Sequence, residues 1–217
     1  MKRAAQQLDG LDLASHALSL GRYSPWPAGR LIPSRSTPDH SISRKVTVVN
    51  LLPIISNALV FGVVLGSILF TTILVVVRIN PETMLRDYPP DVQAEHGPMS
   101  DRSKRQKFLV TILVLAEMFG VIVASLAPIL DDAEAAGLFP TMFVHFFVMF
   151  SVFNVLDWLV LDWLIVVSIR PSFLILPGTE GMAGYRDYAF HFRGFLIGIP
   201  ITLAASLLLA ALVNLLR

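Results

Sequence analysis

The 217-residue sequence has no cysteine, and only 15% of its residues are Asp, Glu, Lys or Arg. The lack of cysteine excludes disulfide bonds, thiol nucleophiles, thiolate zinc sites and CxxC redox pairs. The formal net charge of +1 leaves no basic surface that would neutralise phosphates, so we expect no nucleic-acid partner. In contrast, 54% of the residues are hydrophobic and the mean hydropathy is +0.66, which is too apolar for an ordinary soluble domain.

Four long apolar runs hold most of the hydrophobic residues, and the stretches between them hold most of the charges. About 20 apolar residues in a helix cross a hydrocarbon core of ~30 Å. The sequence therefore predicts an all-α integral membrane bundle of four transmembrane helices in contact with a lipid bilayer. We predict the spans at about residues 57–77, 108–130, 143–169 and 194–216.

The first apolar run is too long for one crossing, because it extends from residue 46 to residue 77. Asn50, Pro53 and Ser56 interrupt its first part. We therefore expect residues 46–56 to lie at the interface or inside the bundle, and the spanning helix to begin at Asn57.

A tail at residues 1–45 precedes the four-helix domain at residues 46–217. The tail is rich in Ser, Pro and Arg and has no long apolar run, which predicts disorder. Because a few apolar residues near its start fall at helical spacing, a weak amphipathic helix is the alternative. A further hypothesis is that the natural chain starts near Val46.

Lys and Arg are concentrated in the loops at residues 78–107 and 170–193, whereas residues 131–140 contain neither. The positive-inside rule places the two basic loops in the cytoplasm and both termini outside. The basic residues of the tail oppose this orientation, because they would have to be translocated.

The third predicted span contains Asn154, Asp157 and Asp162. Its aliphatic residues each favour insertion by roughly 0.3 to 0.6 kcal/mol, and each central Asp opposes it by about 2.5 to 3.5 kcal/mol, so the run still inserts. Together with Glu117 of the second span, the two Asp residues are expected to share a layer near the midplane. No Lys or Arg lies within any predicted span.

Acidic groups in such a layer either keep their protons or bind a cation. In the first case Glu117, Asn154, Asp157 and Asp162 are hydrogen-bonding contacts between helices, which is the interpretation we favour. In the second case they form a proton or cation path. In an α-helix Asp157 and Asp162 are about 140° apart, so we expect them to face different neighbours and Asn154 to pair with Asp157.

A second polar group lies in the third loop and just after it: Glu180, Arg186, Asp187, His191 and Arg193. The glycines of this loop match no nucleotide-binding motif, whereas Tyr and Arg at a membrane boundary suit contacts with lipid phosphates. Glu180, Asp187 and His191 are also candidate acid and base groups for an enzyme that acts on lipid headgroups. Because His145 and His191 are predicted at opposite ends of the bundle and no HExxH occurs, we expect no haem, metal or other cofactor.

Three short elements carry a resemblance: Asp87-Tyr88-Pro89-Pro90-Asp91, the segment 156–164 with its two Leu-Asp-Trp triplets, and Leu176-Pro177-Gly178-Thr179-Glu180-Gly181. With them, residues 50–215 resemble a group of small uncharacterised bacterial multi-pass membrane proteins. The resemblance implies a bacterial cytoplasmic membrane and supplies no catalytic residues. From the residues themselves, the proline-rich turn at 87–91 is expected to be architectural.

The function stays open among three classes. We favour a non-enzymatic membrane component with a buried carboxylate layer, and the alternatives are a small proton- or cation-linked transporter or channel and an interfacial enzyme acting on lipid headgroups. Because four helices enclose little volume, a homo-oligomer is a further expectation, and the sequence indicates no protein partner.

Overall fold

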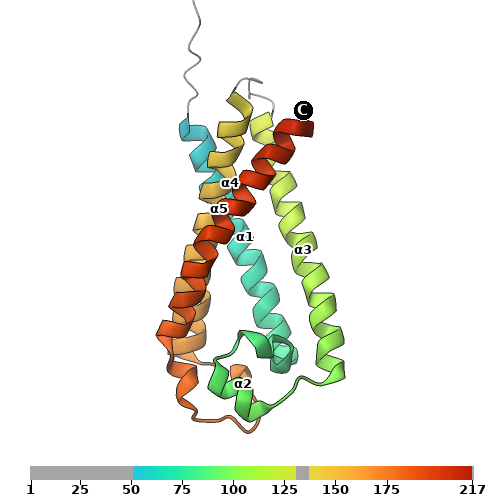
Figure 1. Cartoon of the computed structure of the whole chain (residues 1–217), viewed down its shortest axis with the longest axis vertical. Helices are drawn as coiled ribbons and strands as arrows, with labels where there is room; N and C mark the ends of the chain where they lie inside the picture. The colour runs from blue at the N-terminus through green and yellow to red at the C-terminus, as the bar shows by residue number, and fades with distance from the viewer. Residues whose placement is uncertain (1–50, 131–136, 217) are drawn as a thin grey trace, which may run out of the picture. The chain divides into compact units, whose positions relative to one another are not determined.

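The computed structural model describes residues 51–130 and 137–216, and neither range contains a β-strand. Its long helical elements are α1 (Leu51–Ile79), α3 (Asp101–Leu130), α4 (Leu138–Leu156) continued by η3 (Asp157–Ile169), and α5 (Tyr188–Leu216) (Figure 1). These four stretches are each long and apolar enough to cross a membrane, with mean hydropathies of 1.9 to 2.7. The prediction of an all-α protein with four membrane-spanning helices is confirmed. The predicted tail and the acidic segment at 131–136 lie outside the described residues.

The helices begin earlier than the apolar runs predicted. The first spanning helix was expected to begin at Asn57, and α1 is helical from Leu51, so it takes in Pro53 and Ser56. Proline is tolerated there because the N–H groups of a helix's first turn have no partner within the helix. Likewise, α3 and α5 start several residues before their apolar stretches, because polar residues extend a helix beyond the hydrocarbon core.

Helix α4 is the centre of the bundle: it packs against α1 and against α5, and α3 packs mainly on α1. In Figure 1, α4 and α5 run side by side. Large buried side chains of α4 fill the core, among them Met142, Phe146, Met149 and Phe150. A lipid environment provides no hydrophobic drive between helices, so their association depends on close packing and hydrogen bonds.

Small residues on α1 and α5 make that close packing possible. On α1, Ala58, Gly62 and Gly66 recur every four residues and are buried. A Cβ on Gly62 would lie 2.7 Å from the backbone oxygen of Met149 and 2.7 Å from Cβ of Val152. On α5, three buried small residues recur at the same spacing: Thr202, Ser206 and Ala210. Helix α4 is therefore held between two stripes of small residues, a pattern typical of membrane helix interfaces.

The two basic loops fold together into a cap, which we define as residues 80–100 and 170–187. It contains the short helices η1 (Pro81–Asp87), α2 (Pro90–His96), η4 (Ser172–Leu174) and η5 (Ala183–Arg186). Its apolar core consists of Leu85, Tyr88, Val92, Leu176 and Tyr185. The loops thus form a small packed structure at one end of the bundle.

The element at residues 87–91 contacts residues on either side of the glycine-rich element at 176–181 in the cap. The Tyr88 hydroxyl donates to Leu174 O (2.8 Å), and the Tyr88 ring meets Tyr185 edge-on at 5.9 Å. Burial, and then the neighbouring Tyr185 and Asp87, raise the pKa of Tyr88 above its usual range, so its hydroxyl remains a donor. Asp91 accepts from the backbone N–H of Gly184 (2.9 Å). The architectural role expected for residues 87–91 is confirmed.

Replacing Gly62 with Ala tests the close approach of α1 to α4. The added methyl collides with a backbone oxygen, which cannot rotate away, so we expect a loss of about 1–3 kcal/mol, measured as a lower unfolding temperature in detergent. Gly120→Ala is the matched control, because a Cβ there meets nothing within 4 Å. Its unfolding temperature should be unchanged or higher. Equal effects of the two substitutions would contradict the packing.

Candidate functional site

The second part of the third span, η3, is a π-helix, in which hydrogen bonds join residues five apart. The Arg170 N–H donates to Ile165 O (2.9 Å), and the Ser168 hydroxyl donates to Trp163 O (2.6 Å). At 13 residues the element is long for a π-helix, a form that usually occurs as single turns and often at functional sites. The two Leu-Asp-Trp triplets, which begin at Leu156 and Leu161, repeat with this same spacing of five.

The π-helical spacing brings Asp157 and Asp162 together, because residues five apart lie one turn from each other. The expectation that they face different neighbours assumed α-helical geometry, which η3 does not have. Asp162 Oδ1 lies 3.0 Å from Nδ1 of His191 in the first turn of α5. Asp157 interacts electrostatically with both Asp162 and His191. We call the contacting pair Asp162 and His191, together with Asp157, the acidic cluster.

His191 is the partner that compensates the acidic cluster. Its side chain is 8% exposed and that of Asp162 is 22% exposed, so both are largely removed from solvent. Among the described residues, neither Asp forms an ion pair with Lys or Arg. Because Asp162 contacts the first turn of α5, the contact between Asp162 and His191 lies toward the cap end of the spans.

The acidic cluster also meets the cap. Asp87 of η1 is close enough to Asp157 to interact with its charge, and it forms an ion pair with Lys107 (3.4 Å). Asp87 and its ion pair are partly exposed, with side-chain exposures of 64% for Asp87 and 30% for Lys107. A series of ionisable groups therefore extends from the exposed cap to the buried cluster.

Asn154 precedes the acidic cluster by one turn and binds α5 instead of Asp157, contrary to the expected pair. Its amide donates to Phe195 O (3.2 Å). The side chain fits because Gly198 has none: a Cβ on Gly198 would lie 2.8 Å from Cγ of Asn154. A glycine on α5 thus admits a polar side chain from α4.

Aromatic side chains pack beside the acidic cluster, and two of them directly follow its Asp residues in sequence. The Trp158 and Trp163 rings are 4.7 Å apart, and Trp158 stacks on Phe195 at 4.5 Å. The Trp163 indole donates to Tyr188 O (3.3 Å). In the part of the chain that the structure describes, the Trp158 indole N–H is buried and has no hydrogen-bond acceptor. These rings line one side of the cluster with apolar surface.

Glu117, the fourth member of the predicted layer, lies elsewhere. Its Oε1 accepts from the Thr72 hydroxyl (2.7 Å), which links α3 to α1. The Ser67 hydroxyl of α1 donates to Val63 O of its own helix (2.9 Å). The structure therefore divides the predicted layer into the α1–α3 contact at Glu117 and the acidic cluster on η3 and α5.

A polar junction of three helices was not predicted. The Asn57 amide of α1 donates to Ser125 O of α3 (3.0 Å), and the Ser125 hydroxyl lies 2.9 Å from Nε2 of His145 on α4. His145 is fully buried, so its imidazole lies in the core of the bundle. The sequence signal that could have indicated this junction was the presence of two polar residues, Asn57 and Ser125, within apolar runs.

The structure does not bring together the residues proposed as acid and base groups of an interfacial enzyme. Glu180 accepts from Gly178 N–H (3.2 Å), Asp187 accepts from Phe190 N–H (2.9 Å), and His191 binds Asp162. Within residues 51–130 and 137–216, no hydrogen bond or ion pair links any two of Glu180, Asp187 and His191. Arg193 is exposed, and Arg186 lines a pocket that is described below. The arrangement gives no shared acid and base for headgroup chemistry.

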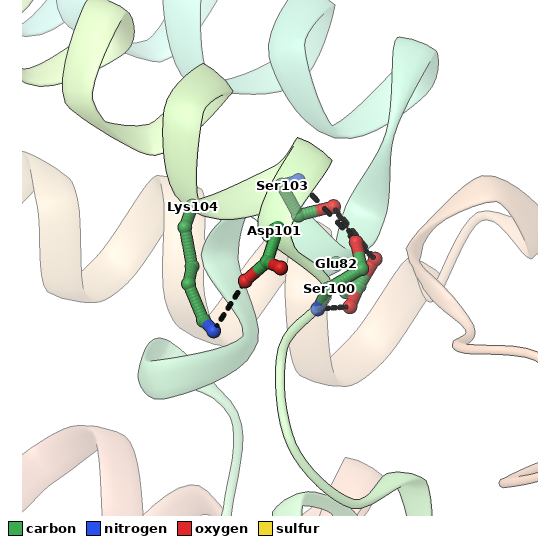
Figure 2. A network of polar contacts seen from close by, with 5 residues as sticks. All are labelled: Glu82, Ser100, Asp101, Ser103 and Lys104. Carbon is green, nitrogen blue, oxygen red and sulfur yellow. Dashed lines mark hydrogen bonds and ion pairs between the residues drawn. The ribbon is translucent and has the colours of Figure 1, made fainter.

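Another carboxylate, Glu82 of η1, anchors the start of α3 (Figure 2). It accepts from the Ser100 N–H, from the Ser100 hydroxyl (2.8 Å) and from the Ser103 hydroxyl (2.6 Å). Burial raises the pKa of Glu82, but the hydrogen bonds from Ser103 and Ser100 together lower it below its ordinary value. The neighbouring Lys104–Asp101 pair is largely exposed and contributes little. Glu82 is thus a structural acid at a helix N-terminus.

No protein-family model, curated protein or solved structure matches this chain. Within the described ranges, no three His, Asp or Glu side chains are grouped so that they would hold a metal ion. The function is therefore inferred from the geometry of the residues themselves.

The lowered pKa of Glu82 predicts an acid-induced loosening of the α3 start. Its stabilisation is complete above the ordinary Glu value of 4.5 and is lost as pH falls through the lower folded-state value. Hydrogen exchange of residues 98–104, corrected for intrinsic rates, should lose protection in that acidic range only. Glu82→Gln should reduce protection above pH 4.5 and remove the loss on acidification, whereas the exposed control Asp101→Asn should retain the wild-type profile. Protection that is independent of pH below 4.5 would contradict this role.

Proposed function

We propose that this multi-pass membrane protein is a non-enzymatic membrane component that binds and releases a proton at the acidic cluster of Asp157, Asp162 and His191. The observation that carries the proposal is the contact between Asp162 of η3 and the buried His191 of α5, with Asp157 near enough for its charge to act on both. Ionisable groups inside a membrane are costly, and they commonly mark ion paths or proton relays. A bacterial cytoplasmic membrane, with the basic cap on the cytoplasmic side, follows from the sequence expectations and is part of the proposal.

The net charge of the acidic cluster determines how readily it binds a proton. Two nearby carboxylates in a weakly polar environment repel each other when both are ionised. A protonated His191 compensates one of them, and a further proton removes the remaining negative charge.

Transport of a proton or a proton-linked solute is the second candidate function. It is favoured by Asp87, which interacts with Asp157 and lies in the partly exposed cap. A proton that entered at Asp87 would meet the acidic cluster next. The enzyme hypothesis lacks comparable support, because its acid and base candidates bind separate partners.

Infrared spectroscopy tests proton binding directly. Titrating the protein in lipid should produce a pH-dependent carboxylic-acid C=O band from the cluster, and Asp157→Asn should remove or shift that band, because it deletes one coupled carboxylate. Glu117→Gln is the matched control, since Glu117 binds Thr72 apart from the cluster and its removal should leave the cluster's band in place. A titration without any change assigned to Asp157 or Asp162 would exclude proton exchange at this site.

Proteoliposomes that contain a pH-sensitive dye test the transport candidate. Under an imposed membrane potential, wild-type vesicles should acidify faster than empty vesicles, and Asp157→Asn should return the rate to that of empty vesicles. Glu117→Gln should transport like wild type. A cluster that titrates in the infrared experiment without supporting flux would favour the non-transporting component.

A further inference from the structure

A pocket of about 270 Å³ lies where the third span meets the cap. Its apolar wall includes Ile169, Ile175 and Met182, and its charged wall consists of Arg170 and Arg186. No Asp or Glu lines it. Ile169 is the last residue of η3 and is 60% exposed, so the pocket opens beside the end of a membrane span. None of Asp157, Asp162 and His191 lines the pocket, so it is separate from the acidic cluster.

The two arginines of the pocket have no counter-charge. Within the described part of the chain, neither Arg170 nor Arg186 forms an ion pair, and Nε of Arg170 is buried without a hydrogen-bond acceptor. The nearest carboxylates in sequence, Glu180 and Asp187, accept hydrogen bonds from backbone N–H groups instead. A buried guanidinium donor without an acceptor is costly, and an anion in the pocket would remove that cost.

The backbone at Arg170 adds a second, independent observation. Arg170 has φ 48° and ψ 64°, and it is the only non-glycine residue with positive φ in the described ranges. It terminates η3 at a position where glycine is the usual residue, because glycine adopts this conformation without strain. A side chain kept at a strained position suggests that the side chain itself has a use.

We propose that this pocket binds a phosphate group, and that the phosphate belongs to an anionic phospholipid headgroup. Guanidinium groups present planar pairs of donors that match phosphate oxygens, and two of them converge on one small volume. The apolar wall suits the glycerol and the first acyl carbons of a lipid. A soluble phosphate compound shares the headgroup chemistry but does not use that wall.

Native mass spectrometry of the delipidated full chain tests the proposal, with phosphatidylglycerol, phosphatidylcholine and glycerol 3-phosphate as probes. Wild type should bind phosphatidylglycerol most tightly. Arg186→Gln and Arg170→Gly should each weaken that binding by roughly 10-fold or more, because each removes charge-assisted hydrogen bonds. Arg170→Gly should also retain or raise the unfolding temperature, since glycine relieves the positive φ.

Arg193→Gln is the matched control, because Arg193 is an exposed arginine close to the membrane boundary that does not line the pocket. It should bind phosphatidylglycerol within about 2-fold of wild type, and Asp157→Asn should do the same. Binding of glycerol 3-phosphate that equals lipid binding and needs both pocket arginines would retain the phosphate site but replace the lipid by a soluble ligand. Unchanged binding in Arg170→Gly and Arg186→Gln, or an equal loss in Arg193→Gln, would overturn the proposal.

Discussion

The close approach of helix backbones to α4 is the constraint on which the rest of this structure depends. Gly62 on α1 leaves room for the backbone oxygen of Met149, and Gly198 on α5 leaves room for the side chain of Asn154. In lipid, such contacts replace the hydrophobic effect as the main source of helix association. They also set the position of α5, and through it the position of His191 beside η3. The acidic cluster therefore depends on the close helix packing that these two glycines allow.

The change from α4 to the π-helix η3 determines which side chains meet. In α-helical geometry the side chains of residues 157 and 162 would diverge, and those of the two Trp residues that follow them would diverge as well. In the π-helix the indoles are in direct ring contact, and Asp162 meets His191 with Asp157 near enough for its charge to act on both. A single feature of the backbone thus produces both the acidic cluster and the aromatic surface beside it. The cap completes the arrangement, because it brings Asp87 near Asp157.

The four spans were predictable because length and hydropathy are local properties of the chain. The spacing of five between Leu156 and Leu161 was visible but was interpreted with α-helical geometry, since single turns are the usual extent of a π-helix. The cap was not predictable, because the contact between Tyr88 and Tyr185 joins distant loops that carry no periodic pattern. Candidate residues were recognised by type, as with Asp157, Asp162 and His191, but their partners depend on packing that local patterns do not specify.

The central claim is that Asp157 and Asp162 share one environment with His191. Solid-state NMR in lipid bilayers measures this directly, through dipolar couplings between the labelled His191 imidazole nitrogens and the side-chain carboxyl carbons of Asp. The π-helical arrangement predicts couplings to both carboxyl carbons, assigned by removing each Asp in turn, with the stronger coupling to Asp162. A coupling to only one carboxyl carbon, with the other Asp beyond detection, would contradict the account and restore the divergent arrangement expected for an α-helix.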